Sequence, residues 1–494
     1  MQLTIPILIP RKIAEATFKA DVKFKTKARV TKRTVDVSEA FGIGVDEEHH
    51  FVIYDNFTVE INKGDIVYLT GDSGSGKSLL LKELATSMLG NGNSEFGRVI
   101  TDREIEGQID PERPVIEQIG RNTNEAINIL SIAGLNEAFL MLRRYSELSD
   151  GQKYRFRLAK MIDAGADTWL MDEFVALLDR TTAKVVAYTM QKAARRLGKT
   201  LIVATTHTDL ERDLNPNLRI FKHFGFKVDV KYRKVNSVKP CSLLRKVIIE
   251  KGSRRDFEEL EQFHYRHGSL IIKAIYRAVL DGKVIGVIVY ASPYLNLRAR
   301  SVVLPQFTGK TTSEHAKKIN KHFVRIARVV VDPKYRSIGF GVKLVKDTLA
   351  RVGYPYVEIL AVMGQYNPFA VKAGMLNVPM ELYANYDKGY LTAVKRLQEI
   401  GFSPDMFSSK THNLRVLKRL SKNAINEVKH LVAGHFISAK FRKPGLKEKV
   451  LGGDLGAISS ALASHRLPYA YAIWKNQKYR KCPAPIFLAR TPKR

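Results

Sequence analysis

The fold of the first part of the chain is decided by Ile66-Val67-Tyr68-Leu69-Thr70-Gly71-Asp72-Ser73-Gly74-Ser75-Gly76-Lys77-Ser78. The first five residues are apolar, β-branched or aromatic, which is typical of a short buried strand. The next eight match the pattern G-x-x-x-x-G-K-[ST], and a helix is expected from Ser78 to Leu89. A glycine-rich turn between a strand and a helix presents backbone amides at a helix N-terminus, where phosphate groups bind. The stretch therefore predicts a nucleotide-phosphate site.

Each residue type in this loop has a use in phosphate binding. The glycines allow the backbone to wrap closely around the anion, Lys77 reaches the terminal phosphates, and the Ser78 hydroxyl can hold Mg²⁺. The residues that we expect to contact nucleotide in this loop are Gly71, Ser73, Gly74, Gly76, Lys77 and Ser78.

Beyond the loop, from Phe51 to about Gly225, short apolar strands alternate with amphipathic helices. This alternation predicts an α/β domain with a largely parallel sheet. One of these strands begins at Thr168 and ends in Asp172 and Glu173. One carboxylate of such a pair can hold hydrated Mg²⁺ while the other polarises an attacking water molecule. Taken alone, the pair is a weak indication of hydrolysis.

The order of the motifs is more specific than any one of them. After the phosphate loop come Leu148-Ser149-Asp150-Gly151-Gln152, then Asp172-Glu173, then Asp179, and finally His207 after a strand. This order resembles the ATP-binding-cassette (ABC) ATPase superfamily, over about residues 35 to 225. The resemblance implies that Asp172 binds Mg²⁺, that Glu173 is the catalytic base and that His207 is a switch residue on the γ-phosphate.

The same resemblance implies a glutamine that contacts both nucleotide and Mg²⁺. We assign this role to Gln108 rather than Gln118, because the spacing from Gln108 to Pro114 and Val115 fits the family better. The resemblance also implies an aromatic residue that stacks on adenine. Phe41 is the candidate, and the alternative for Phe41 is a place in the core.

In this family ATP lies between the phosphate loop of one domain and the L-S-x-G-Q signature of another. Because the chain holds one cassette, the resemblance implies a homodimer in which Ser149 and Gly151 act on the partner's nucleotide. The sequence departs from the family pattern in two places. Asp150 stands where glycine is usual, and its charge would repel a γ-phosphate unless the carboxylate points away. Phe174-Val175 replaces the usual Pro-Thr, which argues weakly against a transporter-type domain.

A second glycine loop, Arg336-Ser337-Ile338-Gly339-Phe340-Gly341, lies between an apolar strand and the helix Val342 to Val352. Upstream, Asp281-Gly282 predicts a two-residue hairpin turn, so this part is expected to be α+β. The arrangement resembles the GNAT N-acetyltransferase fold over roughly residues 240 to 400. The resemblance implies that Ser337, Gly339 and Gly341, helped by Arg336, bind the pyrophosphate of acetyl-CoA or a related acyl-CoA.

The catalytic residues of this second domain follow less directly. Glu358, on the strand Tyr356 to Val362, is the candidate base, and Tyr366, just after that strand, is the candidate acid. A structural role is the alternative for each of them. An insertion at about residues 292–322 carries cations that could touch the substrate. They are Arg298, Arg300, Lys310, Lys317, Lys318 and Lys321.

The chain has 81 Lys and Arg against 49 Asp and Glu, a formal net charge of +32. So large an excess predicts attraction to a polyanion such as DNA or RNA, with a merely cationic protein as the alternative. Residues 11–33, with nine Lys or Arg, are typical of either a nucleic-acid arm or a solvated edge strand. The aromatic residues from Tyr469 to Tyr479, which lie among cations, fit either base stacking or an ordinary strand with a buried face.

These observations predict a basic N-terminal segment (1–34), an ABC-type ATPase domain (35–225), a linker (226–239), a GNAT-like domain (240–402) and a basic C-terminal region (403–494). Cys241 and Cys482 are too few for a disulfide framework or a four-cysteine zinc site. No apolar stretch reaches the length that spans a bilayer. We therefore expect a cytoplasmic protein.

The predicted function is ATP hydrolysis, with ATP and Mg²⁺ as cofactors, by a protein whose GNAT-like domain modifies or acylates nucleic acid. Two alternatives remain open. The first alternative is a nucleotide-gated clamp on DNA or RNA with a non-catalytic GNAT-like scaffold. The second is an ATPase-regulated acetyltransferase for proteins or small molecules.

Overall fold

The computed structural model describes residues 16–26, 28–46, 48–90, 96–264, 270–383, 388–437, 445–464 and 469–486. The chain divides into two compact units. The first unit contains the described residues up to 264 together with 274–289 and 328–348, and the second contains 270–273, 290–327 and the described residues from 349 onward. This division differs from the predicted domain order because the chain passes between the units several times after residue 264.

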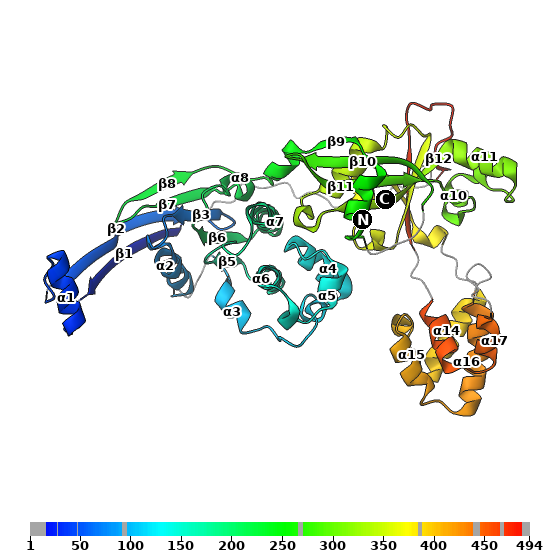
Figure 1. The fold of residues 1–494 in the computed structure, drawn as a ribbon, viewed down its shortest axis with the longest axis horizontal. Coiled ribbons are helices and arrows are strands. Elements are labelled where there is room, and N and C mark those ends of the chain that lie inside the picture. Colours follow the sequence, from blue (N-terminus) through cyan, green and yellow to red (C-terminus); the bar gives the residue numbers. More distant parts are fainter. Residues whose placement is uncertain are drawn as a thin grey trace. The chain divides into compact units, whose positions relative to one another are not determined.

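The first unit is built on a six-stranded sheet with the order β4-β5-β6-β3-β7-β8 (Figure 1). Its neighbouring strands are parallel, except that β8 is antiparallel to β7. The strands are β3 (Ile66–Gly71), β4 (Val99–Thr101), β5 (Thr168–Met171), β6 (Thr200–Thr205), β7 (Leu218–Lys222) and β8 (Val228–Tyr232). Every residue of β3, β5 and β6 is buried, as in parallel sheets that are covered on both faces. The predicted α/β fold with a largely parallel sheet is therefore confirmed.

Helices and short 3-10 helices connect these strands. They are α2 (Lys77–Gly90), α3 (Asp102–Glu106), η1 (Val115–Gln118), α4 (Thr123–Ile132), α5 (Ala138–Leu142), η2 (Tyr145–Glu147), α6 (Asp150–Asp163), α7 (Arg180–Leu197) and α8 (Glu211–Leu214). Successive residues of β3 point to opposite faces of the sheet. Ile66 and Tyr68 pack into a core with α6 and α7, whereas Val67 and Leu69 pack into a second core with α2. The C-terminal end of β3 is thus held from both sides.

A two-stranded hairpin precedes this sheet. β1 (Ala16–Thr26) pairs antiparallel with β2 (His49–Ile61), and α1 (Lys32–Phe41) lies between them in the sequence. Phe18 and Ala20 of β1 are buried in the core shared with α2, while Lys19 and Lys25 are exposed. The basic segment predicted for 1–34 is therefore corrected: from residue 16 it is a strand with a core-facing side, and α1 crosses its boundary. Residues 1–15 lie outside the described part of the chain.

The linker predicted for residues 226–239 is also corrected. β8 lies within it and pairs with β7 from Leu218↔Tyr232 to Lys222↔Val228. The side chains of β8 are largely exposed, so its attachment to the sheet rests mainly on backbone hydrogen bonds. Charged residues on an exposed edge strand protect the sheet from further pairing. That charge made the segment resemble a connecting loop in the sequence.

A second sheet has seven strands in the order β14-β15-β13-β12-β11-β10-β9. They are β9 (Ile248–Lys251), β10 (Ile272–Leu280), β11 (Lys283–Ala291), β12 (Phe323–Val331), β13 (Tyr356–Ala361), β14 (Leu376–Val378) and β15 (Ala470–Lys475). β12 and β13 are parallel, whereas β9–β10, β13–β15 and β14–β15 are antiparallel. Asp281 and Gly282 join β10 to β11 with φ of 47° and 78°, which confirms the predicted hairpin turn.

Helical segments lie between these strands in the sequence. They are η3 (Ser242–Lys246), α9 (Arg254–Glu261), α10 (Arg298–Val303), η4 (Pro305–Phe307), α11 (Ser313–His322), η5 (Pro333–Tyr335), α12 (Phe340–Thr348), η6 (Val362–Gln365), α13 (Phe369–Lys372) and η7 (Met380–Leu382). The Ser253 side chain accepts a hydrogen bond from the Asp256 N–H and starts α9. A buried cluster with Phe307, Phe323 and Tyr356 packs α10 and η4 against β12 and β13.

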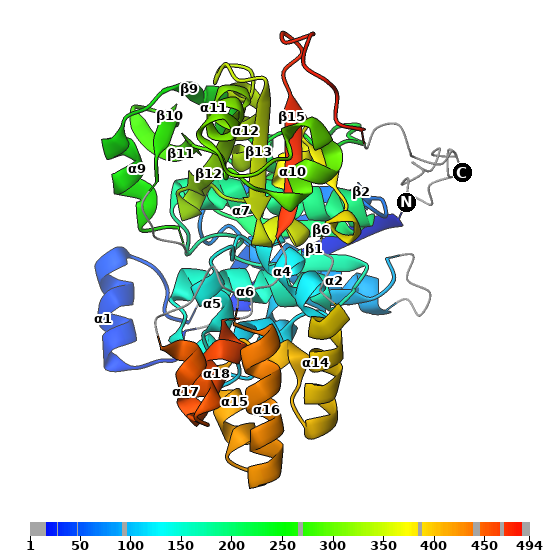
Figure 2. The same cartoon turned by 90° about the vertical axis from the view of Figure 1, so that its right-hand side faces the viewer.

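The last part of the second unit is a helical cluster with its own core (Figure 2). It consists of α14 (Lys388–Ile400), η8 (Pro404–Met406), α15 (Lys410–Leu417), α16 (Lys422–His435), α17 (Leu446–Leu451) and α18 (Leu455–Ala463). The chain then returns to the sheet, because β15 lies between β13 and β14. The boundary predicted at 402/403 is therefore wrong: α14 packs with helices beyond it, and β15 belongs to the sheet before it. Residues 438–444, 465–468 and 487–494 of the predicted basic region lie outside the described part.

Candidate functional site

The phosphate loop connects β3 to α2. Gly71, Gly74 and Gly76 have φ of 142°, 73° and 100°, values that favour glycine. A Cβ on Gly71 would lie 2.0 Å from the Lys222 carbonyl oxygen, and one on Gly76 would lie 2.4 Å from Cγ2 of Ile53. The backbone of the loop therefore lies too close to β7 and β2 at these two positions to leave room for any side chain.

Lys77 folds back over this loop. Its Nζ donates to the carbonyl oxygens of Gly71, at 3.0 Å, and of Asp72, and the residue is buried. Burial lowers the pKa of Lys77, while the carboxylates of Asp72 and Asp172 act in the opposite direction. The ammonium group is thus held at the mouth of the loop that was predicted to receive phosphates.

The hydroxyl of Ser78 lies 3.0 Å from Oδ1 of Asp172, to which it donates. Ser78 is in the first turn of α2, and Asp172 follows β5, so the parallel sheet brings together residues 94 positions apart. A hydroxyl and a carboxylate oxygen are hard oxygen ligands of the kind that Mg²⁺ prefers. The donor set therefore fits the magnesium ion implied by the sequence.

Glu173 follows Asp172 and has an exposed side chain. Its backbone N–H donates to Oδ1 of Asp172 at 2.9 Å, and its φ is 48°. The next two residues, Phe174 and Val175, are fully buried, and the N–H of Val175 donates to the hydroxyl of Tyr154. The segment that replaces the usual Pro-Thr is therefore anchored in the core and fixes the backbone beneath the Glu173 carboxylate.

His207 stands at the end of β6 with its backbone and ring fixed. Its carbonyl oxygen accepts from the hydroxyls of Tyr68 and Thr70. Arg180 donates to Nδ1 of the ring, and Nε2 is buried with no hydrogen-bond partner among the described residues. Because Nδ1 accepts, the neutral ring carries its proton on Nε2. A buried N–H without a partner is uncommon and suits a ring that donates to an anionic ligand.

The signature residues lie at the start of α6. The backbone N–H of Ser149 donates to Oε1 of Gln152 at 3.0 Å, and both Ser149 and Asp150 are exposed. The carboxylate of Asp150 sits in the first helical turn, where negative charge is favourable. A Cβ on Gly151 would lie 3.3 Å from Cδ2 of Leu178. Within the described part of the chain, no hydrogen bond joins these residues to the Lys77 and Asp172 group.

The profile of the ABC transporter family matches residues 54–176, which include the phosphate loop, the signature and the two carboxylates. This part of the chain is an ABC ATPase domain. An uncharacterized ABC transporter ATP-binding protein of Methanocaldococcus jannaschii is 22% identical over 218 residues, or 38% of this chain and 75% of that protein. The cytochrome c biogenesis ATP-binding export protein of Gluconobacter oxydans is 29% identical over 174 residues, or 33% of this chain and 77% of that protein.

Solved structures of ATP-binding cassettes are similar to the ABC ATPase domain. One is a dimeric cassette in a post-hydrolysis state with ADP and phosphate, at 17% identity and a TM-score of 0.33, covering 44% of this chain and 100% of that chain. Another is a dimeric bacterial ABC transporter cassette, at 18% identity and a TM-score of 0.31, covering 38% of this chain and 94% of that chain. Among the helices in the described ranges, none is long and apolar enough to cross a membrane.

Among the described residues, no hydrogen bond joins Gln108 to Asp172, so the role assigned to Gln108 stays a prediction. Gln108 is exposed after α3, whereas Gln118 holds its own loop by bonds to the backbone of Asp110 and Arg113. Asp102 directly follows β4, which pairs with β5. Burial raises the pKa of Asp102, and the charge of Asp172 raises it further. Asp102 was not predicted from the sequence. Its position directly after an apolar strand, as for Asp172, is the pattern that could have identified it.

Phe41 is not brought to the phosphate loop. β2 reaches that loop at Tyr54, whose hydroxyl donates to the Gly76 carbonyl oxygen at 3.0 Å. Phe41 ends α1, which lies beyond the last pair of the β1–β2 hairpin, Thr26↔His49, at the far end from β3 (Figure 1). Its side chain is 77% exposed, so the alternative of a core position is wrong as well. The adenine-stacking role is therefore not supported by this position.

The second glycine loop begins at Arg336, whose side chain is already engaged. Its Nε donates to the Val331 carbonyl oxygen at 2.9 Å and a terminal nitrogen donates to that of Phe263 at 3.2 Å. Burial lowers the pKa of Arg336. Two of its five N–H donors are therefore used by backbone carbonyls, and its predicted help in binding pyrophosphate stays a prediction.

The ABC ATPase domain contacts the same loop. The hydroxyl of Ser337 donates to the Ser131 carbonyl oxygen at 2.6 Å and accepts from Asn136 at 2.8 Å. Ser337 and Gly339 have φ of 69° and 96°, and Gly341 lies in the first turn of α12. Nearby, Lys334 forms an ion pair of 3.5 Å with Asp179, which caps α7. The Ser337 side chain is used for this contact, so the backbone N–H of Ser337 and not its hydroxyl is left for a phosphate.

Glu358, the candidate base of the second domain, is fully buried in an ion pair. Nε of Arg300 donates to its Oε2 at 3.0 Å, and a terminal nitrogen of Arg300 donates to Oε1 at 2.6 Å. The hydroxyl of Tyr471 donates to Oε2 at 3.1 Å, and burial raises the pKa of Tyr471 well above its ordinary value. Both predictions are therefore wrong: Glu358 is not positioned as a base, and Arg300 does not reach outward to a substrate.

The remaining candidates of the second unit are less constrained. Tyr366 is half-buried in the turn after η6, and its role as an acid stays a prediction. Lys318 donates to the Gln306 carbonyl oxygen and lies over the ring of Phe307, so it supports η4. The other cations of the insertion are exposed, namely Arg298, Lys310, Lys317 and Lys321.

Proposed function

We propose that this protein is an ABC-type ATPase that hydrolyses ATP with Mg²⁺ and uses the energy to act on nucleic acid. The observation that carries the ATPase part is the 3.0 Å contact of Ser78 with Asp172 beside the buried Lys77. Ser78 and Asp172 would hold Mg²⁺, which when bound neutralises charge on the phosphate oxygens. Glu173 orients and deprotonates the attacking water, and the Nε2–H of His207 donates to the γ-phosphate.

We assign the active form to a homodimer with two composite sites. Ser149 and Gly151 lie at the exposed N-terminus of α6, where their backbone can meet the nucleotide of a second copy. A helix N-terminus is favourable for a γ-phosphate of the partner's ATP. Asp150 is exposed there too, so its side chain must turn away from that phosphate.

The nucleic-acid part rests on charge. The net charge is +32, and the end of α15, the start of α16 and the turn between them carry four exposed cations: Arg415, Lys418, Arg419 and Lys422. Cations gathered at one turn of a helical pair suit the phosphates of DNA or RNA. Affinity for random oligonucleotides should therefore fall steeply as salt rises, and a flat salt dependence would contradict this part of the proposal.

For the second sheet we propose a GNAT-like acyltransferase fold. The strand order, with β12 parallel to β13 and β13 antiparallel to β15 on its other side, supports this proposal. A second candidate is a non-catalytic scaffold in a nucleotide-gated clamp, and it is favoured by the burial of Glu358 and the engaged side chains of Arg336 and Ser337. Calorimetric titration of the full chain with acetyl-CoA separates the two, because only the acyltransferase binds it.

The ATPase proposal is tested with Glu173→Gln. This variant keeps the size of the side chain but removes the base, so we expect it to bind Mg-ATP as wild type does while turnover falls by at least about 100-fold. A Lys77→Ala control should lose nucleotide binding itself. Turnover that stays unchanged in Glu173→Gln would overturn the assignment of the base.

A further inference from the structure

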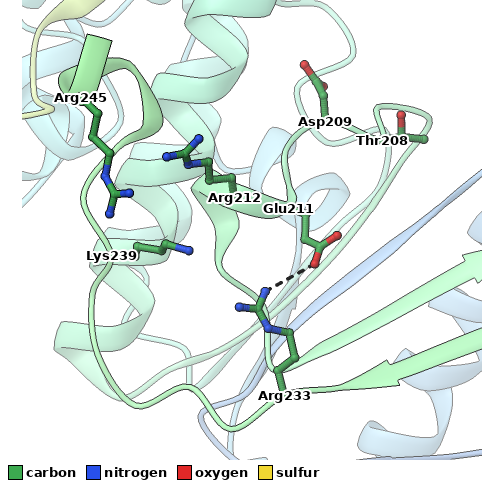
Figure 3. A pocket seen from close by; sticks show the side chains of 7 residues that line it. All are labelled: Thr208, Asp209, Glu211, Arg212, Arg233, Lys239 and Arg245. Atoms are coloured by element: carbon green, nitrogen blue, oxygen red, sulfur yellow. Dashed lines mark hydrogen bonds and ion pairs between the residues drawn. The ribbon is translucent and has the colours of Figure 1, made fainter. Parts of the chain in front are cut away.

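A hollow of about 470 Å³ opens next to the switch residue of the ABC ATPase domain (Figure 3). Thr208 and Asp209, which directly follow His207, form part of its lining. Its basic side chains come from separate elements: Arg212 from α8, Arg245 from η3, and Arg233 and Lys239 from the segment between β8 and η3. Neither the phosphate loop nor the second glycine loop contributes to it.

The wall that carries these cations is held by buried polar side chains. Oε1 of Gln191 accepts from the Lys239 N–H at 2.9 Å, and Asp213 accepts from the N–H and hydroxyl of Ser242, both at 2.7 Å. Asn217 donates to the Val235 carbonyl oxygen at 3.1 Å. Gln191 is fully buried and Asp213 is 1% exposed. The backbone under Lys239 and just before Arg245 is therefore fixed rather than a loose surface loop.

The charges of the hollow do not cancel. Asp209 is paired with Arg180 and Lys184, which do not line the hollow, and Glu211 is paired with Arg219 and Arg233. Among the described residues, no ion-pair partner lies within reach of Arg212, Lys239 or Arg245. Figure 3 shows these three side chains around the same space. The positive charges of Arg212, Lys239 and Arg245 are therefore available to bind an anion in the hollow.

We propose that this hollow binds backbone phosphates of a nucleic-acid strand. Phosphate oxygens are the anions that Arg and Lys recognise best, Arg by paired hydrogen bonds and Lys as a point charge. The volume far exceeds that of a single phosphate ion, and the three cations come from three places in the chain, which suits successive phosphates of a polymer. The inference rests on the proposed nucleic-acid action and names a site for it.

The test is the triple variant Arg212→Gln, Lys239→Gln and Arg245→Gln in the full chain. Binding of fluorescent 20-nucleotide single strands and duplexes is measured by anisotropy over a salt series. Losing three phosphate contacts should reduce the log–log salt slope by about two for single strands and somewhat under three for duplexes. At moderate salt this corresponds to an affinity loss on the order of 10- to 100-fold.

A matched triple variant controls for net charge. Lys82→Gln, Lys273→Gln and Lys346→Gln remove the same charge from exposed positions on α2, β10 and α12. This variant should change the slope by less than about one. Equal losses of oligonucleotide affinity in both triple variants would overturn the proposed phosphate site, because the lower net charge alone would then explain the effect. Binding of a Mg-ATP analogue, which the hollow does not contact, should be unchanged in both and reports that they fold.

Two further outcomes separate this inference from the proposed function. If wild type binds oligonucleotides and the pocket variant binds them equally well, the pocket is wrong while the nucleic-acid action stands. If wild type binds no oligonucleotide at any salt concentration, the nucleic-acid action itself fails. Inorganic tripolyphosphate serves as the small competitor: binding of it that is lost in the pocket variant, without oligonucleotide binding, would assign the hollow to free phosphate compounds instead.

Discussion

At the scale of single residues, the pair of Arg300 and Glu358 shows how burial changes the meaning of a carboxylate. Both side chains are at most 1% exposed, and two hydrogen bonds join them. A buried charge that loses its partner keeps its desolvation cost, whereas an apolar pair of similar volume does not carry it. The pair therefore has a structural role that can be measured without any assay of acyl transfer.

We expect Glu358→Leu to lower the free energy of unfolding of the second unit by about 3–5 kcal/mol, since it leaves Arg300 buried and unpaired. The double variant Arg300→Met with Glu358→Leu should recover most of that loss. The chain has two tryptophans, so a Trp169→Phe background leaves Trp474 in β15 as the fluorescence probe of urea unfolding. Arg298→Met, on the same helix but exposed, is the control. Unchanged stability in Glu358→Leu would restore Glu358 as a candidate base.

Asp102 offers a second prediction at this scale. Its carboxylate directly follows β4, and the charge of Asp172 contributes to raising its pKa. The two carboxylates together therefore attract a divalent cation more strongly than Asp172 alone. We expect Asp102→Asn to weaken Mg²⁺-dependent nucleotide binding about 10-fold, which corresponds to about 1.4 kcal/mol. Titration of Mg²⁺ against a fluorescent ATP analogue measures this. The same titration with Gln108→Ala should give the wild-type value; the reverse pattern would return the role to Gln108.

Some of these residues and their partners could be predicted from the sequence and others could not, because some contacts are local and others join distant parts of the chain. The phosphate loop is local: its strand, its glycines and its helix are contiguous, so their geometry could be expected from spacing alone. The partner of Glu358 is 58 positions away and that of Ser78 is 94 positions away. Asp172 could still be predicted because strand ends of a parallel sheet meet at one edge. Arg300 could not, since it lies on a short helix within an insertion that the sequence presented as exposed.

At the scale of elements, the wrongly predicted bounds of the N-terminal segment and the linker concern strands that carry charge. β1 exposes Lys19, Lys23 and Lys25, and β8 exposes Asp229 and Lys231. In the sequence this charge outweighed the features that make both segments strands. β15 was left open between base stacking and a buried strand, and its buried Tyr471 and Ile473 decide for the strand. The order of elements within the first sheet was predictable, because each βα step is short and local.

A substitution in β15 tests whether the C-terminal region is part of the second sheet. Ile473 is fully buried and is paired with Glu358 on β13 and Leu376 on β14. We expect Ile473→Asp to destabilise the second unit by more than about 3 kcal/mol, because it buries an unpaired carboxylate. Gln477→Asp, two residues after the strand and exposed, should have almost no effect. An unchanged unfolding midpoint in Ile473→Asp would mean that the segment does not pack in the sheet.

At the scale of the whole molecule, the question is how one cassette completes its site. Lys77, Ser78, Asp172 and His207 gather at the end of one sheet, whereas Ser149 and Gly151 lie at the exposed start of α6. Among the described residues, no hydrogen bond joins the two groups. If the signature acts on the nucleotide of a second copy, as proposed, the site of one copy alone is incomplete. In the homodimer proposed above, a second copy related by a two-fold axis would supply its own signature to each site and close both at once.

This arrangement predicts that dimerisation depends on both ATP and the signature. In the Glu173→Gln background, Mg-ATP should convert the monomer to a dimer in light scattering, because the sandwiched nucleotide is no longer hydrolysed. Adding Ser149→Arg places a long cationic side chain in the contact and should keep the protein monomeric while each copy still binds Mg-ATP. Ser313→Arg, at the exposed start of α11, is the matched control and should dimerise normally. A dimer that persists in Ser149→Arg would mean that the two copies do not meet through the start of α6, and the trans role of the signature would have to be abandoned.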